Sequence, residues 1–357
     1  MAAPWLKIER QTRASRVALP AAGVLVVAAA SVPFWGSSSL MKTSVTFLTL
    51  LALAQMWNLL AGYAGLISVG QQAYIGIGAY SLYVLADVVH LNPFLAAFVA
   101  AAIAGVISLP TSILAFRLRG GYFAVGTWVI AEVYRLLVMT NNQVGGGSGI
   151  TIRAAGHIRR ASREHWTYWL ALFVAVGSVA LVYFFLRSRR GLALTAIRDD
   201  ETAADSLGID VTRAKRLVYF LAAVGCGLTG AVIYLNLLRI QPEAAFSVQW
   251  SALMIFAVVI GGVGTIEGPI IGTVVFFVLQ QTLSSYGAWY LILLGVIAML
   301  VTVWAKRGLW GFVVRRWSLE LFPVRRRVRI AEGASPLEQA ALRRADAAVV
   351  SADAPED

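Results

Sequence analysis

The chain has 357 residues, of which 59% are hydrophobic and 13% charged, and it carries a formal net charge of +12. So few charges exclude a soluble globular domain of this length. The basic residues lie between and after long apolar runs, which favours a role in membrane topology over nucleic-acid binding.

Several apolar runs reach the ~20 residues that a helix needs to cross a bilayer. The runs are continuous and do not alternate between polar and apolar residues, as the strands of a membrane barrel would. The sequence therefore predicts an all-α polytopic membrane protein with about eight to ten transmembrane helices. In chain order, the expected spans are 17–35, 43–61, 70–88, 94–116, 122–140, 166–187, 217–238, 249–263, 266–284 and 286–305.

These spans divide the chain into a basic N-terminal tail (residues 1–16), a transmembrane domain (residues 17–305) and a C-terminal tail (residues 306–357). The longest basic loop of the transmembrane domain covers residues 188–216. The C-terminal tail is basic with interleaved apolar residues as far as Ile330, as in segments that contact anionic membrane lipid. Beyond that point its composition is typical of disorder.

Lysine and arginine accumulate in the cytoplasmic segments of membrane proteins. With ten crossings, both tails, the loop after the fourth span and the 188–216 loop fall on one side, so we expect both termini in the cytoplasm. The 141–165 loop departs from this rule, because it falls outside but is rich in arginine. Its charged residues are Arg153, Arg159, Arg160, Arg163 and Glu164.

No pattern in the sequence indicates catalysis. A nucleotide-binding phosphate loop ends in Gly-Lys-Ser/Thr, but none of the four lysines follows a glycine. The three histidines lie at span ends or in the arginine-rich loop and form no metal-binding pattern. The single cysteine, Cys226, cannot form an intrachain disulfide. We therefore expect no catalytic residue, metal site or cofactor in this chain.

The stretch "NLLAGYAGLISVGQQAYIGIGAY", residues 58–80, has five glycines and two glutamines but no charge. Irregular backbone is tolerated at membrane depth only where protein or a water-filled cavity covers it, so we expect a broken helix inside the bundle. Two interpretations stay open, close helix packing and lining of a transport pathway. The candidate residues are Gly65, Ser68, Gly70, Gln71, Gln72, Tyr74, Gly76 and Gly78. The two glutamines either face the pathway or satisfy the broken backbone.

Charges inside the expected spans are few, and Glu132 and Arg135 in "WVIAEVYRLL" stand out. Three residues apart, they share a helix face and can pair. Either Arg135 extends toward the outer interface with Glu132 as its partner, or the two form a polar site on a transport path. The scarcity of other buried charges argues against an ion-coupled carrier.

Glycines also repeat in "GGVGTIEGPIIG", where Gly264, Gly268 and Gly272 are four residues apart. Small residues at this spacing let two membrane helices approach closely. We interpret these three glycines as a helix-packing face.

The basic loop contains "RRGLALTAIRDDETAADSLGIDVTRAKRL", which predicts one short helix. Asp199 or Asp200 can cap its first turn, Glu201 favours the dipole there, and Gly208 suits a left-handed cap. The helix would have about eight residues and a length of ~12 Å. It carries Ala203, Ala204 and Leu207 on closely spaced positions, as expected of a helix that docks into a groove on a soluble partner.

Residues 45 to 305 resemble the permease subunits of ABC importers for branched-chain amino acids, within them the LivM-like branch. The resemblance rests on "LLAGYAGLISVGQQAYIGIGAY", "RLRGGYFAVGTWVIAEVYRLL" with the following "GGGSGI", the loop segment, and "GGVGTIEGPIIG", in that order. The family's coupling loop reads Glu-Ala-Ala followed three residues later by Gly. Ala203, Ala204 and Gly208 keep this pattern, but Thr202 replaces the glutamate. The Gln71–Gln72 pair departs from relatives that have His after the Gly.

The resemblance implies an ABC importer permease fold in the inner membrane, with the Asp200–Gly208 segment as a cytoplasmic coupling helix. It further implies a second, LivH-like permease subunit, two ATPase subunits of the LivG and LivF type that use ATP and Mg, and a periplasmic binding protein that meets the arginine-rich loop. The transported solute is expected to be a branched-chain or related amino acid. The competing classes are a stand-alone secondary transporter of small polar solutes and a membrane enzyme or scaffold.

Overall fold

The computed structural model describes residues 6–9, 13–283, 289–304, 308–317, 321–322 and 327–330. The chain divides into a small unit, 1–20 with 320–357, and a large unit, 21–319. The described part of the small unit includes strands β1 (Leu6–Glu9) and β4 (Arg327–Ile330), which pair antiparallel. The expectation of disorder beyond Ile330 falls outside the described residues.

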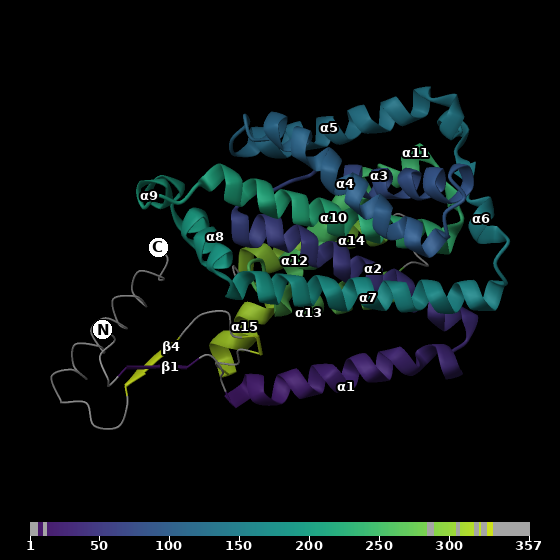
Figure 1. The fold of residues 1–357 in the computed structure, drawn as a ribbon. Helices are drawn as coiled ribbons and strands as arrows, with labels where there is room; N and C mark the ends of the chain where they lie inside the picture. Colours follow the sequence, from purple (N-terminus) through teal and green to yellow (C-terminus); the bar gives the residue numbers. More distant parts are fainter. Residues whose placement is uncertain are drawn as a thin grey trace. The chain divides into compact units, whose positions relative to one another are not determined.

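The large unit is a bundle of membrane-length helices (Figure 1). Ten described helices coincide in order with the ten expected spans. They are α1 (Arg13–Trp35), α2 (Ser38–Asn58), α3 (Gln72–Tyr83), α4 (Pro93–Ala115), α5 (Gly121–Thr140), α7 (Arg160–Arg187), α10 (Val211–Leu237), α12 (Val248–Gly261), α13 (Glu267–Leu283) and α14 (Trp289–Trp304). Among the described residues, six segments are long and apolar enough to cross a membrane. The expected all-α polytopic fold is confirmed.

Shorter elements connect these helices. They are the π-helices η1 (Leu59–Tyr63) and η2 (Val84–Val88), the 3-10 turns η3 (Asn142–Val144) and η4 (Gly146–Ser148), the strands β2 (Ile150–Thr151) and β3 (Arg239–Ile240), and the helices α6 (Arg153–Gly156), α8 (Arg189–Asp199), α9 (Glu201–Ser206), α11 (Pro242–Ala245) and α15 (Gly308–Trp317). The strands β2 and β3 pair antiparallel, which ties the arginine-rich loop to the end of α10.

The helices begin where the sequence supplies caps. The side chains of Ser37, Asn92 and Ser247 accept hydrogen bonds from free backbone N–H groups at the starts of α2, α4 and α12. Each cap satisfies a donor that would otherwise be unpaired at a helix end. Asp210 caps α10 in the same way, through the backbone N–H of Arg213 (2.9 Å).

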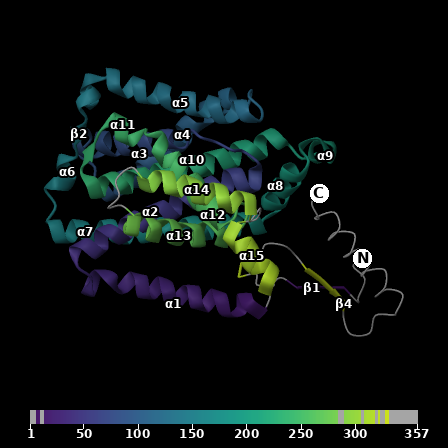
Figure 2. The ribbon, with the colours of Figure 1, turned by 180° about the vertical axis from the view of Figure 1, so that it is seen from behind.

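The core lies around α2 and α10. Helix α10 packs against α3 and α4, and α2 packs against α7 and α10; the two views in Figures 1 and 2 show α2 and α10 within the bundle. Small side chains make the α4–α10 contact possible, because the buried residues of α4 are mostly alanine, with glycine, serine and threonine. Large buried tyrosines, including Tyr74 and Tyr219, fill the space between helices. Helices α12 and α13 form a second closely packed pair.

Candidate functional site

The second membrane segment is broken, as the sequence predicts. Helix α2 continues through the π-helix η1 to Tyr63, and α3 starts only at Gln72. Gly65 adopts a left-handed φ of +67°, which favours glycine. The helix therefore persists past Gly62, and the irregular segment begins at Gly65.

Side chains satisfy the irregular backbone. The buried Ser68 hydroxyl accepts from the N–H of Gly70 (3.2 Å) and from the Gln71 side-chain amide (3.3 Å). The Ser68 carbonyl accepts from the Trp57 indole (2.8 Å). The N–H of Val69 donates to a threonine hydroxyl on α5 (3.2 Å). The break is thus held in place by its neighbours on α2 and α5.

Gln71 and Gln72 are both enclosed, with 0% and 1% of their surface exposed. The side-chain oxygen Oε1 of Gln71 lies 3.6 Å from the sulfur of Cys226 on α10. The side-chain oxygen Oε1 of Gln72 accepts a hydrogen bond from the hydroxyl of Ser251 on α12. In this conformation the two glutamines bind α10 and α12, so their contacts fit a packing role and the pathway role stays a prediction.

Three glycines of this stretch lie where other parts of the chain approach closely. A Cβ at Gly78 would overlap the carbonyl of Gly227 on α10, and one at Gly70 would overlap the carbonyl of Thr127 on α5. At Gly76 it would lie 2.5 Å from the ring of Phe246. Only glycine allows these contacts, which supports the packing interpretation.

Gly268 and Gly272 form a comparable contact between α13 and α12. A Cβ on either would overlap a carbonyl of the α12 segment. Gly264 does not belong to this helical face, which corrects the prediction made for it. It lies in the turn before α13, with a φ of +77°. The four-residue spacing is accidental there, because the helix starts only at Glu267.

That turn is held by polar side chains of α2. The Asn58 amide accepts from the N–H of Gly264 (2.9 Å) and donates to the carbonyl of Thr265 (2.8 Å). One turn earlier, Gln55 donates to the carbonyl of Ile266 (2.8 Å). The sequence analysis missed Gln55 and Asn58. Two amide side chains three residues apart in an apolar span are the feature that would have revealed them.

A third residue whose role was not predicted, Arg198, connects the basic loop to the broken segment. Its guanidinium, at the end of α8, donates to the carbonyl of Gly62 (2.9 Å) across 136 positions of sequence. It also lies beside Gly264, where an added Cβ would be 3.0 Å from Nη1. One arginine therefore touches the end of η1 and the α12–α13 turn.

The basic loop contains the expected short helix, α9. Asp200 caps it by accepting from Thr202 (2.8 Å) and Ala203 (2.9 Å), and Gly208 ends it with a φ of +80°. The helix has six residues and not about eight, because Asp200 is its N-cap and Leu207 is its C-cap. A separate helix, α8, precedes it. An ion pair between Glu201 and Lys215 (2.6 Å) joins it to the start of α10.

The two alanines of α9 point in different directions. Ala203 is exposed, and so is Leu207, at 79% of its surface. Ala204 is only 1% exposed, so it seats α9 against this chain. The prediction that both alanines contact a partner is corrected for Ala204, because its burial leaves no surface for docking.

Helix α5 carries the expected charge pair. Arg135 donates from Nε to both carboxylate oxygens of Glu132, each at 2.9 Å, and its Nη1 lies 2.8 Å from the sulfur of Met139. The side chains are 21% and 43% exposed, respectively. A charge at the centre of a membrane helix costs about 2.5–3.5 kcal/mol on insertion scales, so this exposed pair requires a polar or protein neighbour.

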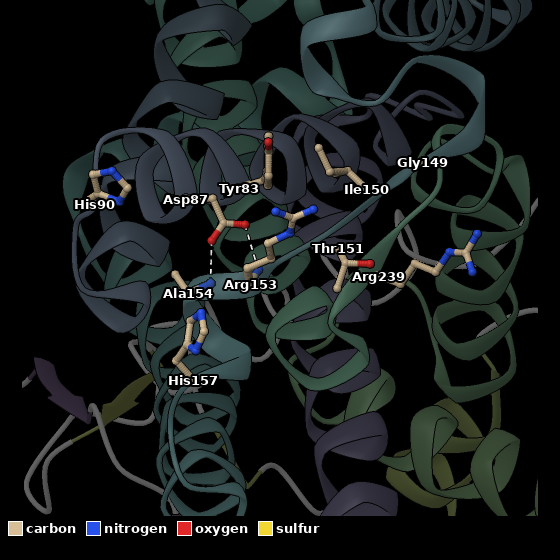
Figure 3. Close-up of a pocket in the computed structure, with 10 residues that line it drawn as sticks. All are labelled: Tyr83, Asp87, His90, Gly149, Ile150, Thr151, Arg153, Ala154, His157 and Arg239. Carbon is tan, nitrogen blue, oxygen red and sulfur yellow. Dashed lines mark hydrogen bonds between the residues drawn. The ribbon is translucent and has the colours of Figure 1, made fainter.

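A cavity of about 620 Å³ lies between the end of α3 and the arginine-rich loop (Figure 3). The Asp87 carboxylate accepts from the backbone N–H groups of Arg153 (2.8 Å) and Ala154 (2.5 Å). The guanidiniums of Arg153 and Arg239 and the imidazoles of His90 and His157 line the same cavity. Two arginines against one aspartate give the lining a net positive charge.

The structure separates the four loop arginines. Arg160 pairs with Glu164 (2.9 Å), and Arg163 donates to the carbonyl of Ala155 (3.2 Å). Arg153 instead lies in the cavity with its side chain exposed. The loop is thus only partly available to an external partner.

A multi-pass bundle with a broken membrane helix and a capped helix exposed on a basic loop is the architecture of a membrane transport subunit. The chain matches the model of the family described as branched-chain amino acid transport system, permease component, over residues 39–303. It is 27% identical to the high-affinity branched-chain amino acid transport system permease protein LivM of Salmonella typhimurium, over 80% of this chain and 73% of the relative. LivM of Escherichia coli is 26% identical over the same shares.

A second permease protein, LivH of Salmonella typhimurium, is 30% identical over 118 residues, which are 33% of this chain and 37% of the relative. No solved structure matches the chain. The chain belongs to the branched-chain amino acid permease family of ABC importers. It is therefore a transport subunit and not an enzyme.

Proposed function

We propose that this chain forms the translocation pathway of an ATP-driven importer together with a second, LivH-like permease subunit. Two ATPases of the LivG and LivF type bind ATP and Mg on the cytoplasmic side, and a periplasmic binding protein delivers the solute. The protein lies in the inner membrane with both termini in the cytoplasm. The solute is a branched-chain or related amino acid, which rests on the names of the relatives.

The observation that carries this proposal is the capped, exposed helix α9. Its outer surface presents Ala203 and Leu207, a small apolar contact for a groove on a soluble partner. On its inner surface Ala204 is buried against the rest of the chain, and α9 contacts α8 and α10. A movement of α9 therefore also moves α8 and α10. Because α8 ends in Arg198, which holds Gly62, the movement reaches the broken segment.

Reconstitution tests the proposed function. The chain, its second permease and both ATPases are placed in vesicles with the binding protein inside or outside, and labelled amino acid uptake is measured. Uptake should require ATP, both ATPases and the binding protein. Uptake by this chain alone, driven by an ion gradient, would instead establish a secondary transporter.

Arg198 is expected to couple the ATPases to the broken helix. Replacing it with methionine keeps most of the apolar stem but removes the bond to Gly62, which is a charge-assisted bond worth about 1.5–3 kcal/mol. In Arg198→Met, uptake should fall about tenfold or more, while the ATPases still co-purify. The matched control is Arg190→Met, which removes an exposed arginine from the same helix. Equal uptake by the two variants would contradict the coupling role.

The basic cavity is expected to receive an acidic side chain of the binding protein. In the double variant Arg153→Gln and Arg239→Gln, the concentration of binding protein that gives half-maximal ATPase stimulation should rise about tenfold, as for a loss of ~1.4 kcal/mol. The difference in half-maximal concentration between the double variant and wild type should become smaller at high salt, because salt screens the charges. Arg213→Gln serves as the control, because Arg213 lies at the start of α10, beside the coupling loop. An unchanged half-maximal concentration would remove the docking role of the cavity.

A further inference from the structure

One face of α5 differs from the rest of the bundle surface. Trp128, Glu132, Arg135 and Met139 follow each other at spacings of four, three and four residues, so they lie on one side of the helix. We call these four residues the α5 polar stripe. Trp128 is 47% exposed, and the side chain of Glu132 is 43% exposed although it is paired with Arg135.

Helix α5 makes few contacts within its own chain. It packs through a narrow row of Phe123, Thr127 and Ala131, and in Figures 1 and 2 it runs along the edge of the bundle. Only 17% of the most apolar 18-residue stretch of α5 is buried. For the other candidate spans in the described part of the chain, the buried share is 44% to 83%. This chain therefore leaves most of the α5 surface uncovered, and that surface contacts either lipid or another protein.

The outward faces of other helices suit lipid. On α4 the exposed large side chains include Leu95, Val106 and Ile113, and on α1 they include Leu25 and Val27. These side chains are uncharged, which suits contact with lipid. The α5 polar stripe therefore differs from these surfaces because it contains charged side chains.

The charge pair lies deep along the span. Glu132 is eleven residues after Gly121, the first residue of α5, which is ~16 Å along the helix at 1.5 Å per residue. That position is near the middle of a hydrocarbon layer ~30 Å thick. Ionised side chains at this depth face protein or water and not lipid.

We propose that the α5 polar stripe is the contact surface for the second permease subunit of the same family. This inference rests on the proposed function, in which two permease subunits share a pathway. In Salmonella typhimurium both LivM and LivH are permease proteins of a high-affinity branched-chain amino acid transport system, and this chain is similar to both. A homologous subunit offers a membrane helix of matching length to lie along α5.

The chemistry of the stripe defines what the partner helix presents. The Glu132 carboxylate can accept further hydrogen bonds besides those from Arg135, so the partner places hydroxyl, amide or basic groups opposite it. Trp128, one turn away, supplies a large aromatic contact that is buried by the partner. The interface then covers the pair and removes its exposure to hydrocarbon.

Site-specific photo-cross-linking in native membranes tests the contact. In the assembled complex, a photoreactive phenylalanine analogue replaces Trp128 on α5, and in matched controls it replaces Val106 on α4 or Leu25 on α1. All three positions are exposed in this chain. Adducts are identified by mass spectrometry. Position 128 should cross-link to the second permease, and positions 106 and 25 should not.

A double leucine variant, Glu132→Leu with Arg135→Leu, gives different results for the two possible neighbours. If the stripe contacts the second permease, co-purification of that subunit with tagged chain should fall about tenfold relative to wild type, a loss of ~1.4 kcal/mol. If the stripe faces lipid, the variant should co-purify it equally well. Val133→Leu, on the flanking surface of α5, should leave co-purification unchanged.

The outcomes separate the two proposals. If the wild-type chain co-purifies no second permease, the proposed function fails. If it does co-purify one but position 128 cross-links only to lipid, to another copy of this chain or to an ATPase, the assignment of the α5 polar stripe is overturned and the proposed function stands.

Discussion

Replacing Ala203 with tryptophan is expected to abolish ATP-driven uptake while leaving the chain folded and inserted. Ala203 is exposed on α9, so a large side chain there obstructs a groove in the docking partner without disturbing this chain's own packing. Uptake into vesicles and co-purification of the ATPases are the two measurements, and both should fall. Ala203→Ser, which is small and polar, should retain both.

The buried neighbour provides a contrast for this experiment. Ala204→Trp places the same side chain against the chain's own helices, so it should lower the thermal unfolding temperature, which Ala203→Trp should not. Gly208→Val should destabilise the C-terminal end of α9, because a β-branched residue at a φ of +80° is strained by about 1–3 kcal/mol. Normal ATPase binding by both Ala203→Trp and Gly208→Val would rule out α9 as the coupling helix.

The second large effect is expected at Gly78, where α3 meets α10. An added Cβ would overlap the carbonyl of Gly227, and a helix backbone cannot shift as a flexible side chain can. Gly78→Ala should therefore destabilise the bundle by about 1–3 kcal/mol or more, as overpacking does. Thermal unfolding in detergent and the amount of protein in the membrane both measure this loss.

Gly177 on α7 is the matched control, since no atom lies within 4 Å of a Cβ placed there. Gly177→Ala should be neutral or stabilising, because alanine favours a helix over glycine by ~1 kcal/mol. A Gly78→Ala protein as stable as Gly177→Ala would mean that the α3–α10 contact is looser than the structure indicates.

Local features of the chain were predictable because they depend on neighbours in sequence. The ten apolar runs coincide in order with ten described helices, and the broken segment follows from its glycines. Asp200 and Gly208 are recognisable as caps because each acts on backbone groups within a few residues. The pairing of Glu132 with Arg135 is likewise a property of one helix.

The direction in which a residue points was not predictable in the same way. Ala203 and Ala204 look equivalent in sequence, yet one is exposed and the other buried, because only one face of α9 packs on α8 and α10. Gly264 fits a four-residue repeat but lies in a turn, since the start of α13 depends on its packing beside α12.

The sequence by itself determined the class of protein, the order of its membrane helices, the position of the break and the capped loop helix. These follow from hydropathy and short-range chemistry, which the folded state does not alter. Only the tertiary structure brought Arg198 to the carbonyl of Gly62 and Asn58 to the α12–α13 turn. Such partners are more than a hundred residues apart, and helix packing alone decides which of them meet.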